Sequence, residues 1–277
     1  MQRRLLLAAL AAGLLALLIA APSSLADTFT PESGGSENAN NIDTLYKITL
    51  YIGIVIFLIV EGTLIWSLVR YRHRRAAPEA AQIRGNTPLE LGWTVGAALI
   101  LVVLTVITFV YLGDIEKPQA SEPGGLASGV EVASIGQPNP PGKAKTLNIK
   151  VNGQQYLWRY DYPGKDIYSY YELVVPIKTT VTLDIESPDV VHSWWIPKLG
   201  GKTDAVPGHT SETWFRISRP GNYSGQCAEL CGENHADMRA RVRAVTPDQY
   251  ERFIRRLKAD IKHAQTELAT QRRQREQ

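Results

Sequence analysis

The stretch "CAELCGENHADM", from Cys227 to Met238, holds both cysteines of this 277-residue chain and one of its two methionines. His235 lies between the second cysteine and Met238. Thiolate, thioether and imidazole groups suit copper, and a mononuclear copper site of this kind uses one cysteine, two histidines and a methionine. A second thiolate on the same loop can bridge two metal ions. The loop therefore predicts a copper site, and its paired cysteines favour a binuclear one.

Such a site needs a second histidine from a distant part of the chain. His192 in "DVVHSWWIP" is the candidate, because it lies at the end of a predicted strand and beside tryptophans that would keep the site dry. The alternative for this residue is an ordinary place in the core. The remaining histidines lie in a basic loop, a Pro-Gly turn and the C-terminal tail and are assigned no metal: His73, His209 and His263.

The two cysteines have an alternative use as a structural disulfide, which is common in exported domains. A bond between Cys227 and Cys231 would close a very small ring, and such a ring restricts the unfolded chain little. It would also leave His235 and Met238 without a role. We therefore favour the metal site over the disulfide.

Residues 1–26 have the pattern of a secretory signal peptide, with two arginines before an apolar stretch and small residues before the cleavage point. An uncleaved membrane anchor is the alternative. In either case the next segment, residues 27–44, is exported. The net charge is only +3, with the basic residues mainly in one short loop and at the C-terminal end, so we expect no nucleic-acid partner.

Residues 45–113 are predicted to form a transmembrane helical hairpin. Its apolar runs, from about Leu45 to Val69 and from about Leu89 to Leu112, are each long enough to span the ~30 Å hydrocarbon layer. The connecting loop, residues 70–88, carries five arginines and should be cytoplasmic. The chain after Gly113 then lies outside a bacterial plasma membrane, and membrane lipid is an expected partner of the hairpin.

Two carboxylates lie within these apolar runs. Glu61 is inside the first run, where a charged group usually faces a protein partner rather than lipid. The hairpin is therefore expected to pack against another membrane subunit. Glu90 follows Thr87 and Pro88 at the start of the second run, where a carboxylate also stabilises a helix N-terminus.

Residues 114–145 are rich in Pro, Gly, Ser and Ala and should hold a linker and the region of a first strand. Residues 146–246 predict an all-β sandwich or barrel, because short segments of alternating apolar and polar residues are separated by turn residues. These segments are "TLNIKV", "QYLWRYDY", "YYELVV", "TVTLDIE", "TSETWFRI" and "MRARVRAV".

Residues 247–277 are predicted to form a C-terminal helix and tail. Thr246 and Gln249 have the spacing of a capping box, and apolar residues follow at helical spacing. The apolar stripe fades after about Lys262, so we expect a frayed or solvated end.

The loop "QCAELCGENHADM" resembles the C-x-E-x-C-x3-H-x2-M loop of subunit II of the haem-copper cytochrome c oxidases. Four further stretches resemble motifs of that family in the same order: "NTPLELGWT", "QQYLWRYDYP", "DVVHSWWIPKLGGKTDAVPG" and "RPGNYSGQCAELCG". The resemblance covers most of the chain. It implies a two-helix transmembrane hairpin followed by an all-β cupredoxin-like Greek-key barrel.

The resemblance also implies a binuclear copper A centre. Its ligands would be two bridging thiolates, one imidazole on each ion, and two weak axial ligands: Cys227, Cys231, His192, His235, Met238 and the backbone carbonyl of Glu229. The Glu229 side chain resembles the family ligand to a magnesium ion at the boundary with subunit I. Asp204 in "KTDAVPG" is its expected partner there.

The resemblance further assigns electron entry and a proton path. In this family electrons from cytochrome c enter near an aromatic run, and Tyr156 stands where many members have tryptophan. We take Tyr156 as the entry residue and Trp158 as the second choice, with core packing as the alternative for Trp158. Glu90 matches the family glutamate near the cytoplasmic mouth of a proton path, with helix capping as the alternative.

The expected partners are subunits I and III and cytochrome c. No C-x-x-C-H motif occurs in the sequence, so we expect cytochrome c on a separate chain. The carboxylates near the copper histidine offer a local patch for a basic cytochrome: Asp184, Glu186 and Asp189.

The implied function is electron entry into a cytochrome c oxidase, which passes electrons to haem in subunit I for reduction of oxygen to water coupled to proton pumping. The oxygen chemistry itself belongs to subunit I. A quinol oxidase subunit II of the same fold is one alternative, but it lacks the copper ligands. A membrane-anchored copper carrier is the other, and its metal loop would be exposed rather than packed by Trp194 and Trp195.

Overall fold

A computed structural model describes residues 30–72, 82–126, 146–164 and 166–276. The chain forms two compact units: Thr44–Pro118 is one, and the segments on either side of it, Met1–Asp43 and Gln119–Gln277, make up the other. The predicted signal peptide, part of the arginine-rich loop and most of the predicted linker lie outside the described residues.

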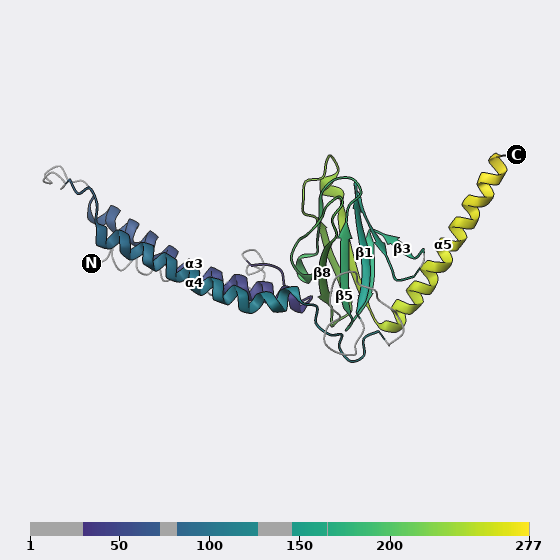
Figure 1. Ribbon diagram of the computed structural model, residues 1–277, viewed down its shortest axis with the longest axis horizontal. Coiled ribbons are helices and arrows are strands. Elements are labelled where there is room, and N and C mark those ends of the chain that lie inside the picture. The colour runs from purple at the N-terminus through teal and green to yellow at the C-terminus, as the bar shows by residue number, and fades with distance from the viewer. Residues whose placement is uncertain (1–29, 73–81, 127–145, 165, 277) are drawn as a thin grey trace, which may run out of the picture. The chain divides into compact units, whose positions relative to one another are not determined.

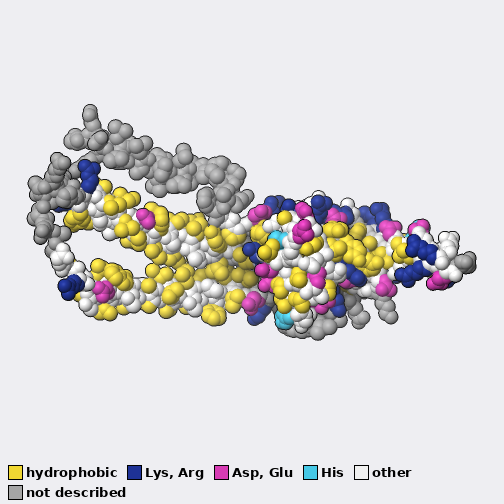
Figure 2. Space-filling view, turned by 90° about the horizontal axis from the view of Figure 1, so that it is seen from above, with side chains coloured by type: hydrophobic (Ala, Val, Ile, Leu, Met, Phe, Trp, Pro, Cys, Tyr) yellow, Lys and Arg dark blue, Asp and Glu magenta, His cyan; other side chains and the backbone are white. Residues whose placement is uncertain are grey.

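The smaller unit contains two long helices, α3 (Glu37–Arg70), whose first residues belong to the larger unit, and α4 (Thr87–Glu116). Both are long and apolar enough to cross a membrane, and Figure 2 shows apolar side chains over their visible face. Each helix is longer than its predicted apolar run. Glu61 lies in the middle of α3 and is half-buried.

The larger unit is built from two five-stranded sheets (Figure 1). The first sheet has the order β3 (Tyr168–Tyr170), β2 (Leu157–Asp161), β1 (Leu147–Gln154), β5 (Thr180–Glu186) and β8 (Ser211–Arg216). The second has the order β4 (Glu172–Pro176), β10 (Arg239–Val245), β9 (Gly221–Cys227), β6 (His192–Trp195) and β7 (Thr203–Ala205). Two pairs are parallel, β1 with β5 and β4 with β10, and the others are antiparallel.

Apolar side chains from both sheets pack into one core. Trp194 of β6 stacks on Phe215 of β8 with ring centroids 6.2 Å apart, and its indole N–H donates to the Tyr160 hydroxyl of β2 at 3.3 Å. These contacts hold the strand that carries His192 against the first sheet.

The two packed sheets confirm the all-β fold that was predicted from alternating residues.

Four strands were missed in the sequence: β3, β6, β7 and β9. Three of them have only three or four residues, too few to establish an alternation. The fourth, β9, contains Gly225, where a Cβ atom would collide with the carbonyl oxygen of Trp195. This close approach between β9 and β6 requires glycine. The prediction that His192 ends a strand was also wrong, because it begins β6.

Helix α5 (Pro247–Arg275) closes the chain and starts at the predicted capping box of Thr246 and Gln249. Its first turns pack Tyr250 and Phe253 against Tyr162 of the larger unit. Beyond Lys262 the side chains are exposed, as expected, but the helix does not fray. The exposed turns contain Ala, Glu, Gln, Leu and Arg, which favour the helix without a packed face.

Candidate metal centre

The predicted ligands meet at one end of the second sheet. His192 is the first residue of β6 and Cys227 is the last of β9, and the loop from β9 to β10 carries Cys231, His235 and Met238. Main-chain hydrogen bonds tie down the start and the end of this loop. The Cys227 N–H donates to the Met238 carbonyl at 2.9 Å, and the Ala228 N–H donates to the Ser193 carbonyl at 2.8 Å.

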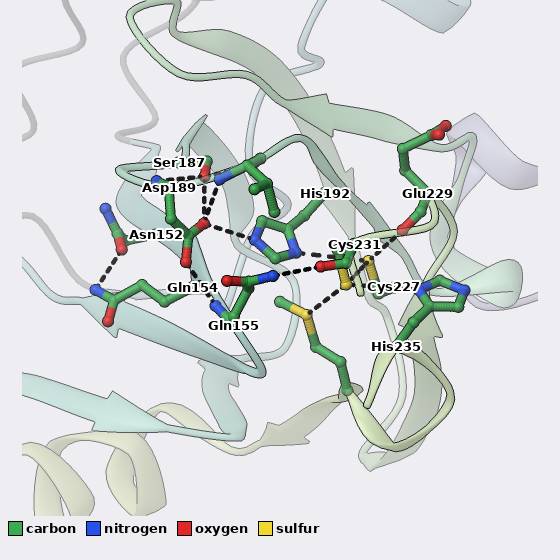
Figure 3. A network of polar contacts seen from close by, with 12 residues as sticks. Asn152, Gln154, Gln155, Ser187, Asp189, His192, Cys227, Glu229, Cys231 and His235 are labelled. Carbon is green, nitrogen blue, oxygen red and sulfur yellow. Dashed lines mark hydrogen bonds and ion pairs between the residues drawn. The ribbon is translucent and has the colours of Figure 1, made fainter. Parts of the chain in front are cut away.

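The donor atoms form a chain of short separations (Figure 3). Cys227 Sγ lies 3.9 Å from Cys231 Sγ and 3.9 Å from His192 Nδ1. Cys231 Sγ lies 3.6 Å from His235 Nδ1 and 3.8 Å from Met238 Sδ. One atom each of His192, Cys227 and Cys231 falls within 4.8 Å of the other two, as ligands of a common metal must.

These separations fit metal ligation. Two ligand atoms on one tetrahedral ion, at bond lengths of about 2.0–2.3 Å, lie about 3.3–3.8 Å apart. A disulfide needs its sulfurs about 2.05 Å apart, and the two cysteines are free thiols. The disulfide alternative is therefore wrong for this structure. Two soft sulfurs, two imidazoles and a thioether are a donor set suited to copper.

Four of the five predicted ligand side chains are shielded from water, and the fifth, His235, is half-buried. His192 and Met238 are 0% exposed, Cys227 is 2% exposed and Cys231 is 4% exposed. The His192 ring also packs edge to face on Trp158, with centroids 6.0 Å apart. Among the predicted aromatic neighbours, Trp194 is buried, whereas Trp195 is half-buried and lies under the ammonium group of Lys202.

The two thiols differ in acidity. Burial raises the pKa of the Cys227 thiol, but hydrogen bonds with His192 and with the main chain of Ser193 and Glu229 outweigh burial and lower that pKa to about 6. Burial and the neighbouring Cys227 raise the pKa of the Cys231 thiol to about 11. Cys227 is therefore the more acidic of the two thiols, and a bound cation would favour the thiolate form of both.

A carboxylate fixes the orientation of His192. Asp189 Oδ1 lies 2.9 Å from His192 Nε2, so Nδ1 is the ring nitrogen that faces Cys227. The N–H of Val190 and the hydroxyl of Ser187 also bond to Asp189 Oδ1, at 2.6 and 3.0 Å. Metal-bound histidines commonly have such a carboxylate on the other ring nitrogen.

The turn between β1 and β2 covers the other side of the loop. The Gln155 amide donates to the Cys231 carbonyl at 2.6 Å, and the Glu233 N–H donates to the Tyr156 hydroxyl at 3.1 Å. Tyr156 is half-buried at this contact, while Trp158 is 0% exposed. Of the two predicted entry residues, Tyr156 alone reaches the surface.

Glu229 presents two different groups. Its backbone carbonyl accepts a hydrogen bond from the Cys227 thiol at 3.2 Å, inside the cluster. Its side chain is exposed and turned away from the sulfurs (Figure 3). Asp204 lies on β7, is exposed and pairs through its main chain with Ser193. In the described parts of the chain, neither carboxylate belongs to a group of three ligands that could share an ion.

Glu90 belongs to the smaller unit and lies in the first turn of α4. Its Oε1 accepts a hydrogen bond from the Asn86 N–H at 3.1 Å, while the Asn86 side chain accepts one from the Leu89 N–H at 3.3 Å. This reciprocal pair caps the helix. The capping alternative for Glu90 therefore has direct structural support.

The predicted acidic patch near His192 is smaller than expected. Asp184 is buried and accepts a hydrogen bond from Asn148 at 3.1 Å, and Asp189 is turned toward His192. Glu186 alone of the three is exposed without such a role. Sequence reasoning missed the supporting roles of Asp189 and Gln155. The position of Asp189 three residues before His192 was the available signal.

Two family models match the chain. The model described as "Cytochrome C oxidase subunit II, periplasmic domain" matches residues 165–245. The model described as "Cytochrome C oxidase subunit II, transmembrane domain" matches residues 25–110. The first match includes all of the predicted copper ligands, from His192 to Met238.

Relatives with known names agree with these matches. "Cytochrome c oxidase subunit 2" of Thermostichus vulcanus is 34% identical over 255 residues, which cover 81% of this chain and 77% of the relative. The protein of that name from Alkalihalophilus pseudofirmus is 33% identical over 208 residues, covering 75% of this chain and 56% of the relative. The crystal structure of the periplasmic domain of subunit II of cytochrome oxidase from Bradyrhizobium japonicum is 31% identical, with a TM-score of 0.40, and covers 42% of this chain and 95% of that one.

Proposed function

The chain belongs to the cytochrome c oxidase subunit II family, and from this premise we propose that it is the electron-entry subunit of a membrane-bound oxidase. In this proposal it accepts electrons from cytochrome c, carried on a separate chain, and delivers them to haem in subunit I. Reduction of oxygen to water, coupled to proton pumping, takes place in the complex with subunits I and III.

The observation that carries the proposal is the buried cluster of two free thiols with an imidazole beside each one. When bound there, a pair of copper ions would supply one-electron transfer. Cys227 and Cys231 would bridge the ions, and His192 and His235 would each bind one. The Met238 sulfur and the Glu229 carbonyl lie close enough to be the weak axial ligands.

The protein prepares this chemistry through its own residues. The Asp189 carboxylate holds the His192 ring in one orientation, and main-chain hydrogen bonds from Cys227 and Ala228 anchor the loop. Trp158 packs edge to face with the imidazole and is itself fully buried, which helps to exclude water. A site held in this way changes its geometry little when charge is added, which keeps the barrier to electron transfer low.

Tyr156 is the entry residue we propose. It is half-buried, and its hydroxyl is in contact with the Glu233 N–H of the metal-binding loop. A partner can therefore reach its ring while the ring stays linked to the site. Trp158 packs in the core and serves instead as a neighbour of His192.

Two further roles complete the proposal. The exposed Glu229 carboxylate, with Asp204, would complete a magnesium site together with subunit I. Glu90 would stand at the cytoplasmic entrance of a proton path as well as capping α4.

The copper carrier is a weaker candidate, because a carrier must expose its thiols to a receiving protein and these thiols are buried. The quinol oxidase alternative is disfavoured by the presence of every copper ligand.

The test is the copper content and electron spin resonance of the full-length chain, purified free of its partner subunits. We expect two copper ions per chain and a mixed-valence signal shared by two nuclei. Cys227→Ser and Cys231→Ser should each abolish that signal, whereas His209→Ala, outside the cluster, should keep it. A single copper ion with a mononuclear signal would refute the binuclear proposal.

A further inference from the structure

We propose that Gln155 is a positioning residue that links the two halves of the metal site, holding the loop of Cys231 in register with the strand of His192. This inference rests on the proposed copper function for its purpose. Its contacts, however, are formed by the protein alone.

Gln155 forms hydrogen bonds with two separate residues of the site, Cys231 and Asp189 (Figure 3). Its side-chain amide donates to the Cys231 carbonyl at 2.6 Å. Its main-chain N–H donates to Asp189 Oδ2 at 2.8 Å, and the other oxygen of Asp189 lies 2.9 Å from His192 Nε2. A continuous path of hydrogen bonds therefore runs from the main chain of one ligand to the ring of another.

The site needs this link because sheet pairing supports only half of it. β6 pairs with β9 at two positions, Trp194 with Cys227 and Trp195 with Gln226, which fix Cys227 relative to His192. The loop that follows leaves the sheet until β10 begins. Cys231 lies in that loop, so its distance from His192 depends on contacts outside the strand ladder.

The β1–β2 turn supplies those contacts. Beside the Gln155 bond, the Tyr156 hydroxyl accepts the Glu233 N–H, on the far side of Cys231. Gly232 lies between them, and a Cβ there would come within 2.5 Å of the Tyr156 hydroxyl and 2.9 Å of the Gln155 amide nitrogen. The β1–β2 turn is therefore in close contact with the segment from Cys231 to Glu233.

Such a link would help electron transfer by keeping two ligand segments at a fixed distance. In the proposed centre His192 and Cys231 would hold a common ion, so a change in the distance between these two residues would alter the surroundings of that ion. Hydrogen-bonded supports outside the ligands usually affect metal affinity by about 10–100-fold. Gln155 acts on two ligand segments together, although it touches no donor atom.

The test compares Gln155→Met with Gln154→Met in the full-length chain. Methionine is close to glutamine in size but cannot donate the hydrogen bond. Gln154 is the matched control, because its amide donates to Asn152 at 2.6 Å and not to the metal loop. We expect copper transfer to a chelator to become about tenfold faster or more in Gln155→Met. We also expect an altered copper absorption spectrum, with Gln154→Met like the parent.

A second measurement needs no metal. In the copper-free full-length chain, hydrogen exchange at the amides of Gly232 and Glu233 should quicken in Gln155→Met and in Gln155→Asn, whose shorter amide cannot reach. If both variants exchange like Gln154→Met, Gln155 does not hold the loop and the proposal is overturned. If the parent chain fails to bind two copper ions, the proposed function fails, while this exchange result still decides the role of Gln155.

Discussion

The Asp189 carboxylate and the His192 ring form a pair, with Oδ1 and Nε2 separated by 2.9 Å. The pair determines which nitrogen of a fully buried ring faces the sulfurs, and the sulfur of Cys227 lies 3.9 Å from that nitrogen. The arrangement places a negative charge behind the imidazole, which makes the ring a better electron donor to a cation. Asp189 is exposed, yet its carboxylate supports the site by orienting the ligand ring.

Replacing this carboxylate should weaken copper binding. We expect Asp189→Ala to lower copper affinity by about 10–100-fold, because the ring loses its orienting acceptor. Asp189→Asn should lie between the parent and Ala, since an amide oxygen still accepts a hydrogen bond but carries no charge. Competition with a chelator measures the change. Glu186→Ala removes a nearby exposed carboxylate and serves as the control; equal losses in both variants would contradict this role.

Met238→Leu should separate ligation from packing. Met238 is fully buried with its sulfur 3.8 Å from that of Cys231, and leucine has a similar volume. The loss in unfolding free energy should stay below about 1.5 kcal/mol. The two copper ions should be retained, because the axial bond is weak, but the reduction potential should shift. Redox titration measures that shift, and an unchanged potential would rule out ligation by Met238.

Gly232→Ala should disturb the metal loop through its contact with the β1–β2 turn. Gly232 has φ of +128°, and an added Cβ would lie 2.5 Å from the Tyr156 hydroxyl. Gly208 also has positive φ, at +77°, but its Cβ would meet nothing within 4 Å. Gly208→Ala therefore carries the cost of backbone strain alone.

We expect both glycine variants to lower the unfolding free energy by about 1–3 kcal/mol through strain. Gly232→Ala should in addition release copper faster, because the turn is displaced from the loop. Thermal unfolding and chelator competition separate the two effects. Copper release that is as slow in Gly232→Ala as in Gly208→Ala would mean that the turn does not support the loop.

Much of this fold could be predicted because its signals are local. Alternating residues identified β1, β5 and β10, and Thr246 with Gln249 marked the start of α5. The short strands β6 and β7 were not predicted. Their conformation depends on pairing with neighbouring strands rather than on their own residues. Their positions follow from the packed sheet, which no short segment encodes.

The predicted metal ligands could be identified from the sequence for a similar reason. Cys227 and Met238 lie on one loop, so their proximity needed no knowledge of the fold. The residues that support that loop could not be identified from the sequence. Gln155 reaches Cys231 because β1 and β2 turn at one particular residue, and Asp189 looked like a surface carboxylate until its neighbour's orientation was known. Residues that bind the metal can be recognised in the sequence by their type. Residues that position those ligands can be recognised only from their contacts in the folded structure.

Arg216 should be important for the stability of the larger unit. Its guanidinium group is 9% exposed and lies 2.6 Å from Glu37 and 3.3 Å from Glu122, so two distant segments meet at the end of β8. It also donates to the Ala120 carbonyl. Arg216→Met would leave these partners without a cation.

We expect Arg216→Met to lower the unfolding free energy by about 1–3 kcal/mol, less than for a fully buried pair because both glutamates are partly exposed. Arg219→Met, at an exposed position nearby, is the control and should change it by less than about 0.5 kcal/mol. Chemical denaturation of the full-length chain measures both. The ion pairs matter little if the two variants unfold alike.

Glu90→Gln can separate a proton role from helix capping. The Glu90 carboxylate accepts the Asn86 N–H at 3.1 Å, and a glutamine oxygen can accept the same bond. The substitution therefore keeps the cap and removes only the ionisable group. We expect turnover of the complex to fall severalfold while the copper spectrum and the thermal stability stay unchanged. Glu90→Ala removes both functions and should lower stability as well. If Glu90→Gln turns over at the parent rate, capping is the whole role of Glu90, because that variant keeps the hydrogen-bond acceptor and lacks only the ionisable group with its charge.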